Sequence, residues 1–400
     1  MRRRVKITGI GPVTPAGIGR EAFFKGINEP VSRVRKIDRF DKKAGAFVGA
    51  EINDFSLRAY APKEVPRRLA RHTQFAIAAA KLAVEDAGLE LGDIAKLNPA
   101  IISGSTLMDC EGIEKTYDQV SRFGPMFALA NSIITGLSIA VPDKIAQVLE
   151  VNARILSLQT ACCSGVDAIG QGVELIATGQ ADLAICGGTE APLYYHPMLE
   201  LGMLGLSPRS DEEPQKICRP FDLWRTTGVI GEGACMVVLE PEESPRPAYA
   251  IISGYGHAHH KEDEIGASWR ESMAMALSNA KMTKEMIDYI CAWGPGHKTV
   301  DLIETRMLGR IFRERLAEIP VSSIKGSIGS PLAAAGPIQV ASACLSIRHD
   351  LIPPTVNWNT PDPDCALNLS TSPRRIRVRR CLINGHAISG NSANLVLESP

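Results

Sequence analysis

The sequence lacks the features that mark several large classes of protein. Its 44 basic residues equal its 44 acidic residues, so no net charge favours binding to nucleic acid. No apolar run approaches the ~20 residues that a membrane-spanning helix needs. The basic N-terminus, "MRRRVKITGIG", also lacks the long apolar core of a signal peptide. We therefore expect a protein with no nucleic-acid partner and no membrane span.

Cysteine is present, but not in the patterns that bind metals or build disulfide scaffolds. The ten cysteines show no paired metal-ligand spacing, and most lie in apolar segments where a reduced thiol packs as a small hydrophobic group. The cluster "HAHHKEDE" at 257–264 mixes ligand types without metal spacing, and we interpret it as a solvated loop. These patterns predict a cytoplasmic protein without a metal site.

The sequence does contain similar segments that recur in the same order. Its 400 residues exceed what one hydrophobic core usually serves. Strand patterns ending in glycine occur in two pairs, and the second member of each pair repeats the order of the first. We predict a duplicated α/β architecture with halves 1–240 and 248–400 joined by "EPEESPRP", and chance similarity of short strands is the alternative. The paired segments are 4–11 with 250–256, and 100–105 with 289–294.

Two adjacent cysteines, Cys162 and Cys163, lie within "SLQTACCSGVDAIG", between a strand pattern over 153–161 and a helical pattern over 164–180. The unpaired N–H groups and the positive dipole end of a helix N-terminus stabilise a thiolate and can also hold an oxyanion. Position alone therefore leaves a nucleophilic cysteine and a pair of buried structural thiols equally open.

The segment "TACCSGVDAIGQGVELIATGQADLAICGGTE" resembles the nucleophile region of the elongating β-ketoacyl-(acyl carrier protein) synthases. The resemblance extends over nearly the whole chain, through "VKITGIGPVTPAG", "CRPFDLWRTTGVIGEGACMVVLE", "VSSIKGSIGSPLAAAG" and "IPPTVNWNTPD". It implies a thiolase-like fold with duplicated α-β-α-β-α layers, and no cofactor. It also implies that Cys162 is the acyl-accepting cysteine and that Cys163 takes a position usually held by Ser, Ala or Thr.

The family mechanism implied by this resemblance has two half-reactions. An acyl group first passes from acyl carrier protein to the cysteine, and malonyl-carrier then loses carbon dioxide to give an enolate that attacks the acyl thioester. Two histidines, in segments of the form "AHGTGT" and "KxxxGH", hydrogen-bond the enolate oxygen. Both segments occur here, at 291–304 and 322–336, but Trp293 and Ser330 stand at the histidine positions, while Lys325 is retained.

The two replacements predict impaired condensation. Asp301 and Glu304 keep the acidic positions of the first segment, but neither an indole nor a hydroxyl replaces an imidazole that titrates near neutrality. Loss of one oxyanion donor typically costs ~2.7–4 kcal/mol, or 10²–10³ in rate. We therefore expect ordinary malonyl decarboxylation to be crippled.

Other histidines lie near the expected site. "NGHAISGNSANLVLE" aligns with the family's C-terminal loop, so His386 and Ile388 stand at two phenylalanine positions, and the backbone N–H of Ile388 would complete an oxyanion hole with that of Cys162. His386 stays open between a polar active-site residue and a structural one. His297 lies in a Gly-Pro-Gly loop, and we interpret it as exposed, with an inward rearrangement as the alternative.

Two functions are compatible with these departures. In the first, Cys162 accepts an acyl group, and the protein is an acyltransferase or an atypical condensing enzyme of fatty acid or polyketide-type biosynthesis. In the second, the protein is a non-catalytic subunit similar to a chain-length factor, paired with a complete synthase. Chain-length factors also lose histidines, but they generally lose the cysteine too, whereas "TACCSG" is intact here. The intact turn favours the enzyme.

The expected partners are acyl carrier protein and a second synthase-like chain. The segment "VPRRLARH" at 65–72 places Arg67, Arg68 and Arg71 at the start of a predicted long helix, on or near one face. Acyl carrier proteins are acidic, so we expect these arginines to attract the carrier, with a solvated helix end as the alternative. The strand before Cys162 would otherwise leave a sheet edge open, which predicts an obligate homodimer or heterodimer.

Overall fold

A large mixed sheet forms the framework of the protein. In the computed structural model, which describes residues 2–38, 47–208, 212–260, 266–387 and 389–400, ten strands follow the order β11-β10-β14-β15-β9-β1-β8-β7-β5-β6, and β2 pairs with β1. The strands are β1 Val5–Thr14, β2 Gly17–Ile18, β3 Arg35–Lys36, β4 Val48–Gly49, β5 Pro99–Gly104, β6 Arg154–Leu158, β7 Leu183–Glu190, β8 Gly233–Pro241, β9 Ala250–His259, β10 Tyr289–Cys291, β11 Val321–Ser322, β12 Leu351–Ile352, β13 Arg374–Arg375, β14 Arg380–His386 and β15 Asn391–Glu398. The helices are α1 Arg20–Asn28, α2 Arg71–Asp86, α3 Leu91–Ile94, α4 Cys110–Phe123, α5 Ala130–Thr135, α6 Ala140–Leu149, α7 Ser164–Ala177, α8 Tyr195–Met203, α9 Ala267–Asn279, α10 Lys298–Phe312, α11 Lys325–Ile328 and α12 Ala335–His349.

The sheet has the same strand order on both sides of its central β1–β9 pair. β1 is antiparallel to β8, and β8 to β7, just as β9 is antiparallel to β15, and β15 to β14. The outer strands β5 and β6 are parallel to their neighbours, as β10 and β11 are on the other side. This repetition supports the predicted duplication, and we keep the boundaries 1–240 and 248–400 as a proposal.

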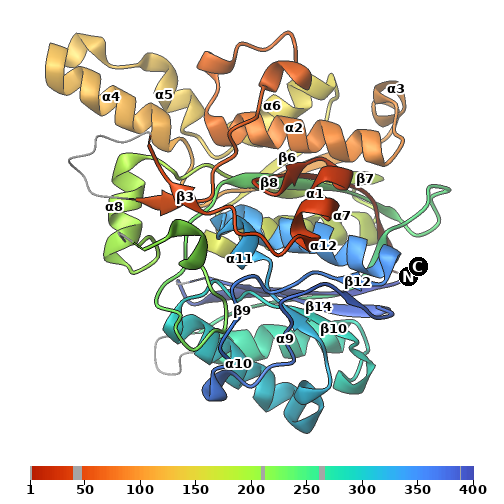
Figure 1. Cartoon of the computed structure of the whole chain (residues 1–400). Helices are drawn as coiled ribbons and strands as arrows, with labels where there is room; N and C mark the ends of the chain where they lie inside the picture. Colours follow the sequence, from red (N-terminus) through yellow and green to blue (C-terminus); the bar gives the residue numbers. More distant parts are fainter. Residues whose placement is uncertain (1, 39–46, 209–211, 261–265, 388) are drawn as a thin grey trace.

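The two halves of the sheet and the helices that cover and separate them form five layers (Figure 1). Helices α2 and α6 cover the outer face of the N-terminal half-sheet, α9 and α10 cover that of the C-terminal half-sheet, and α7 and α12 lie between the two. The buried apolar residues form one large cluster around α7 and α12, two further clusters beneath the outer helices and a small fourth cluster that includes Val48 and Val229. The predicted α-β-α-β-α architecture is confirmed.

The two central strands contact their covering helices in equivalent ways. A β-carbon on Gly9 of β1 would lie 2.1 Å from the carbonyl oxygen of Ala83 in α2. A β-carbon on Gly254 of β9 would lie 2.0 Å from the carbonyl oxygen of Ala276 in α9. Only glycine permits a helix this close, so the glycine-ended strand patterns mark two matching strand–helix contacts.

The N-terminal half presents an open sheet edge and an apolar surface. Strand β6 ends the sheet in the described part of the chain, and four of its five residues are half-buried. Helices α4 and α5 and their connection expose several large apolar side chains, including Met126, Ile133 and Tyr117. Within the described ranges, no helix has both the length and the apolar character to cross a membrane.

Candidate active site

The turn that carries Cys162 connects strand β6 to helix α7. Cys162 lies in a single 3-10 turn, Ala161–Cys163, which leads directly into α7 at Ser164. Ala161 has a φ of 54°, a left-handed conformation that costs a non-glycine residue of order 1–3 kcal/mol and is common at functional turns. The Ser164 hydroxyl accepts a hydrogen bond from Thr160 N at 2.8 Å and donates to Ala161 O at 2.5 Å, which holds the turn in place.

The two adjacent thiols have different environments. Cys162 is 7% exposed and lines a cavity of about 760 Å³. Cys163 is fully buried, and its Sγ lies 3.6 Å from the carbonyl oxygen of Asn391. Burial, with a smaller contribution from Asp167, raises the pKa of the Cys163 thiol well above its usual value. Only Cys162 is therefore placed to react with a ligand in the cavity.

The cavity brings together four of the residues that the sequence singled out. Cys162, Trp293, Ser330 and His386 all lie on its wall. Its remaining wall is mainly apolar, which is typical of a small-molecule site with a few placed polar groups. The other lining residues are Leu206, Gly228, Val229, Ile230, His259, His260, Gly266, Ser268, Trp269, Pro295, Val300, Ile303, Leu332, Ala387, Ser389 and Gly390.

Lys325 lies directly behind Trp293. Its Nζ donates to Trp293 O and, at 3.1 Å, to Gln339 Oε1, and it lies 4.0 Å from the centre of the Trp293 ring. The lysine is 1% exposed, and burial lowers its pKa to about 8. The ammonium therefore contacts two acceptor oxygens and an indole ring.

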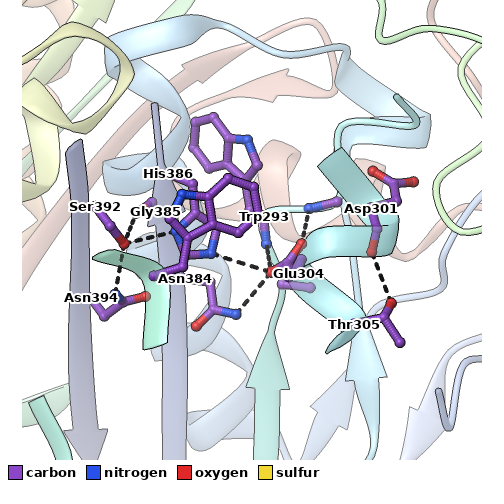
Figure 2. A network of polar contacts seen from close by, with 12 residues as sticks. Trp293, Asp301, Glu304, Thr305, Asn384, Gly385, His386, Ser392 and Asn394 are labelled. Carbon is purple, nitrogen blue, oxygen red and sulfur yellow. Dashed lines mark hydrogen bonds and ion pairs between the residues drawn. The ribbon is translucent and has the colours of Figure 1, made fainter. Parts of the chain in front are cut away.

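Glu304 and Asp301 are fully buried and act on the backbone of the Trp293 segment. Glu304 accepts hydrogen bonds from Trp293 N, Gly294 N and Asn384 Nδ2, each at 2.8 Å, and the first and third are visible in Figure 2. Asp301 accepts from Gly296 N, in the same segment, at 3.1 Å and from Phe221 N at 2.7 Å. Burial raises the pKa of both carboxyl groups, that of Asp301 to about 7. The two acidic positions therefore hold the loop and do not line the cavity among the described residues.

His386 ends strand β14 within a network of polar contacts (Figure 2). Its Nδ1 lies 2.8 Å from Ser392 Oγ, and its Nε2 lies 3.9 Å from Glu304 Oε1, too far for a hydrogen bond. The ring stacks on Trp269 and meets Trp293 edge to face with 6.5 Å between centroids. Burial lowers the pKa of His386 well below its usual value, so the imidazole is neutral.

Two histidine interpretations need correction. His297 is half-buried and not exposed, and its Nδ1 accepts from Thr299 N at 3.2 Å and caps the N-terminus of α10. His257 is not in a solvated loop either: it lies on β9, with Nδ1 3.0 Å from Asp167 Oδ1. Of the predicted cluster at 257–264, positions 261–264 lie outside the described residues.

The basic segment also differs from its prediction. The sequence predicts Arg67 and Arg68 at the start of the long helix, but this helix, α2, begins only at Arg71. The two arginines are exposed and lie in a 3-10 turn over Pro66–Arg68. Arg71 binds the fully buried Glu232 through two hydrogen bonds, at 2.7 and 3.0 Å. Its guanidinium is thus committed within the fold, and only Arg67 and Arg68 are left to face a partner.

Ile388, the predicted second oxyanion donor, lies outside the described residues, so that role stays a prediction. Sequence reasoning also missed two residues of the site. Trp269, from α9, stacks on His386, and Gln339, from α12, holds the Lys325 ammonium. Neither had a local signal, since each acts across elements distant in sequence. No group of three His, Cys, Asp or Glu side chains in the described ranges is placed to hold a metal.

Both halves of the chain match models of known protein families. Residues 2–244 match the model of the β-ketoacyl synthase N-terminal domain, and residues 249–359 match that of its C-terminal domain. The chain is 32% identical to the ketoacyl synthase alpha subunit of the tetracenomycin polyketide synthase from Streptomyces glaucescens, covering 100% of this chain and 97% of that protein. It is also 32% identical to 3-oxoacyl-[acyl-carrier-protein] synthase 2 from Coxiella burnetii, with 99% of both chains covered.

Solved structures agree in fold over the full chain. The ishigamide ketosynthase/chain length factor superposes with a TM-score of 0.93 at 29% identity, covering 100% of both chains. A ketosynthase of a type II polyketide synthase, in complex with its acyl-carrier protein and bound to a hexaketide, superposes with a TM-score of 0.90 at 27% identity, again over 100% of both chains.

Proposed function

This chain belongs to the β-ketoacyl synthase family, and we propose that it accepts an acyl group on Cys162 and transfers it without ordinary malonyl decarboxylation. One observation carries the proposal: the Cys162 thiol opens to an apolar cavity whose wall has Trp293 and Ser330 at the two histidine positions. The nucleophile turn is intact, whereas the groups for enolate stabilisation are replaced. The family resemblance supplies the expectation that histidines would stand there.

The acylation step needs only groups that the chain retains. The Cys162 thiolate attacks the carbonyl carbon of a carrier-bound thioester, the new sulfur–carbon bond forms, and the carrier thiolate leaves. The N-terminus of α7 favours both the thiolate and the oxyanion of the tetrahedral intermediate. We propose the backbone N–H groups of Cys162 and Ile388 as the oxyanion donors.

The second half-reaction lacks its donors. Each missing oxyanion donor costs 10²–10³ in rate, so the pair together should suppress malonyl decarboxylation strongly. His386 is buried and neutral, its Nδ1 is engaged with Ser392, and its Nε2, which has no hydrogen-bond partner in the described structure, lies 3.9 Å from Glu304 Oε1. We therefore assign it a structural part in the site and not the role of replacement donor.

Acyl carrier protein is the proposed source of the acyl group. A structural relative was solved with its acyl-carrier protein. In this chain Arg67 and Arg68 are exposed beside a groove of about 840 Å³. An acidic carrier would be attracted to these two cations. We propose a cytoplasmic location, in keeping with ten cysteines that form no disulfide in the structure.

A subunit role similar to that of a chain-length factor is the second candidate. It is favoured by the likeness to a structure described as a ketosynthase/chain length factor and by the loss of both histidines. Under this proposal the chain pairs through its N-terminal half with a complete synthase and shapes the partner's acyl tunnel. The reactive placement of Cys162 then has no catalytic use, which makes this the weaker candidate.

The test is intact-mass spectrometry after incubation with acyl-carrier thioesters. We expect a mass increase equal to one acyl group in the wild type and in Cys163→Ala, and none in Cys162→Ala. Cys163→Ala is the matched control, because it removes a neighbouring thiol that does not line the cavity in the described structure. No acylation of the wild type, together with activation of an added complete synthase, would establish the subunit role instead.

A further inference from the structure

The indole of Trp293 lies between a buried cation and the cavity. Trp293 lines the cavity with Cys162, whereas Lys325 is not among the described lining residues. The Lys325 Nζ is 4.0 Å from the centre of the indole ring, and the lysine is 1% exposed. The ring face therefore covers the ammonium on the side that would otherwise face a ligand.

Trp293 is held in this position from several directions. Its backbone N–H donates to Glu304, and its carbonyl accepts from Lys325 itself. Its ring meets the edge of His386, whose own ring is stacked on Trp269. A side chain packed this way is preorganised, so the cover over Lys325 does not depend on a mobile loop.

We propose that Trp293 shields the Lys325 ammonium from the cavity and thereby directs the site to acyl transfer and away from decarboxylation. In decarboxylation of a malonyl thioester, the bond between Cα and the carboxylate breaks, carbon dioxide leaves, and the electron pair passes to the thioester oxygen as an enolate. A proton from solvent then adds to Cα and gives the acetyl thioester. A cation or N–H donor open to the cavity would stabilise that enolate oxygen.

The ammonium cannot supply this stabilisation in the native site. Its Nζ already contacts Trp293 O, Gln339 Oε1 and the indole, so donation to a ligand would compete with these contacts. Loss of the ring at position 293 would uncover this cation. An imidazole there would also add an N–H donor of its own. The inference rests on the proposed acylation of Cys162 in the same cavity.

Shielding is measured directly by reductive methylation of lysines, mapped by mass spectrometry. We expect Lys325 to stay unmodified in the wild type and in Trp293→Phe, which keeps an aromatic face over Nζ. In Trp293→Ala we expect Lys325 to be methylated at a rate approaching that of an exposed lysine such as Lys63. Methylation of Lys325 in the folded wild type, or its protection in Trp293→Ala, would overturn the inference. The melting temperature of each variant is recorded to establish that the labelled protein is folded.

The functional consequence is measured as carbon dioxide release from malonyl-carrier. Trp293→His should raise the rate at least tenfold over wild type, because one donor is worth 10²–10³. Trp224→His, on an exposed tryptophan outside the cavity wall, is the matched control and should leave the rate unchanged.

Acylation of Cys162 is followed in the same samples. Failure of wild-type acylation refutes the proposed function, whereas acylation without a gain in Trp293→His refutes this inference alone.

Discussion

The ring of His386 lies parallel to that of Trp269, with 4.1 Å between centroids and 6° between planes. This stacked pair joins strand β14 to helix α9 at the wall of the cavity. One imidazole nitrogen is bonded to Ser392, while the other, Nε2, is buried without a hydrogen-bond partner in the described structure. Stacking on Trp269 stabilises the fold, whereas burial of the unpaired Nε2 destabilises it. Substitutions of His386 can therefore separate the contribution of the ring's shape from that of its nitrogen atoms.

The first prediction concerns this pair. His386→Phe keeps a ring against Trp269. It loses the stabilising hydrogen bond to Ser392 but also removes the destabilising unpaired nitrogen, and the two effects on stability offset each other. We expect the free energy of unfolding to stay within about 1 kcal/mol of wild type, and acylation of Cys162 to persist. His386→Ala leaves a cavity and should cost about 2–4 kcal/mol. Urea unfolding checks both values. Loss of acylation in a folded His386→Phe protein would show instead that the imidazole takes part in chemistry.

The second prediction follows from the lowered pKa of Lys325. Burial lowers this pKa from 10.5 to about 8, so between these values the unfolded chain holds more protons at this site than the folded one. The free energy of unfolding contributed by Lys325 therefore rises with pH over this range. Lys325→Met should remove this rise, which is at most ~1.4 kcal/mol per pH unit.

Urea unfolding of both proteins at about pH 7.5 and about pH 9.5 measures the difference. Lys63→Met, on a lysine whose side chain is 89% exposed, serves as the control and should leave the slope as in wild type. Equal pH slopes for wild type and Lys325→Met would mean that the folded lysine keeps its ordinary pKa.

The nucleophile turn could be predicted from sequence because its determinants are local. A strand pattern, a Cys-Cys-Ser-Gly turn and a helical pattern follow one another within 157–170, and the structure has β6, the 3-10 turn and α7 in that order. The duplication was also predictable, because close strand–helix contacts require glycines at fixed places. Such signals need only a few neighbouring residues.

The environment of the site could not be predicted in this way. Lys325 is 32 residues from Trp293, and Trp269 is 117 residues from His386, so their contacts exist only after the sheet has assembled. The helical pattern at 67–89 likewise gave no sign that Arg71 would be drawn to Glu232, 161 residues away. Burial and partners decide what each of these side chains does, and both are tertiary properties.

The third prediction separates the three arginines. Arg67→Glu with Arg68→Glu should raise the KM for an acyl-carrier substrate by about tenfold or more, and should leave the fold and the reaction with a small acyl thioester unchanged. Arg71→Ala should instead cost about 3–5 kcal/mol in unfolding free energy, because it removes the cation that balances the buried Glu232 charge through two hydrogen bonds. Acylation kinetics and urea unfolding check the two expectations. An unchanged KM in the double variant would remove this segment from the carrier surface.

The last prediction concerns assembly. The sheet ends at β6 within the described part of the chain, and the α4–α5 segment of the same half exposes Met126 to 92% and Ile133 to 75%. An open edge and exposed apolar side chains in the same half favour association with a second synthase-like chain. We expect light scattering to report a dimer at every concentration at which the protein stays folded.

Met126→Glu with Ile133→Glu should weaken the dimer, because both charges would be buried on association. Met275→Glu, on the outer helix α9 of the other half, is the matched control and should leave the mass unchanged. A stable folded monomer of wild type would refute an obligate dimer, and a dimer that resists both charges would place the interface elsewhere.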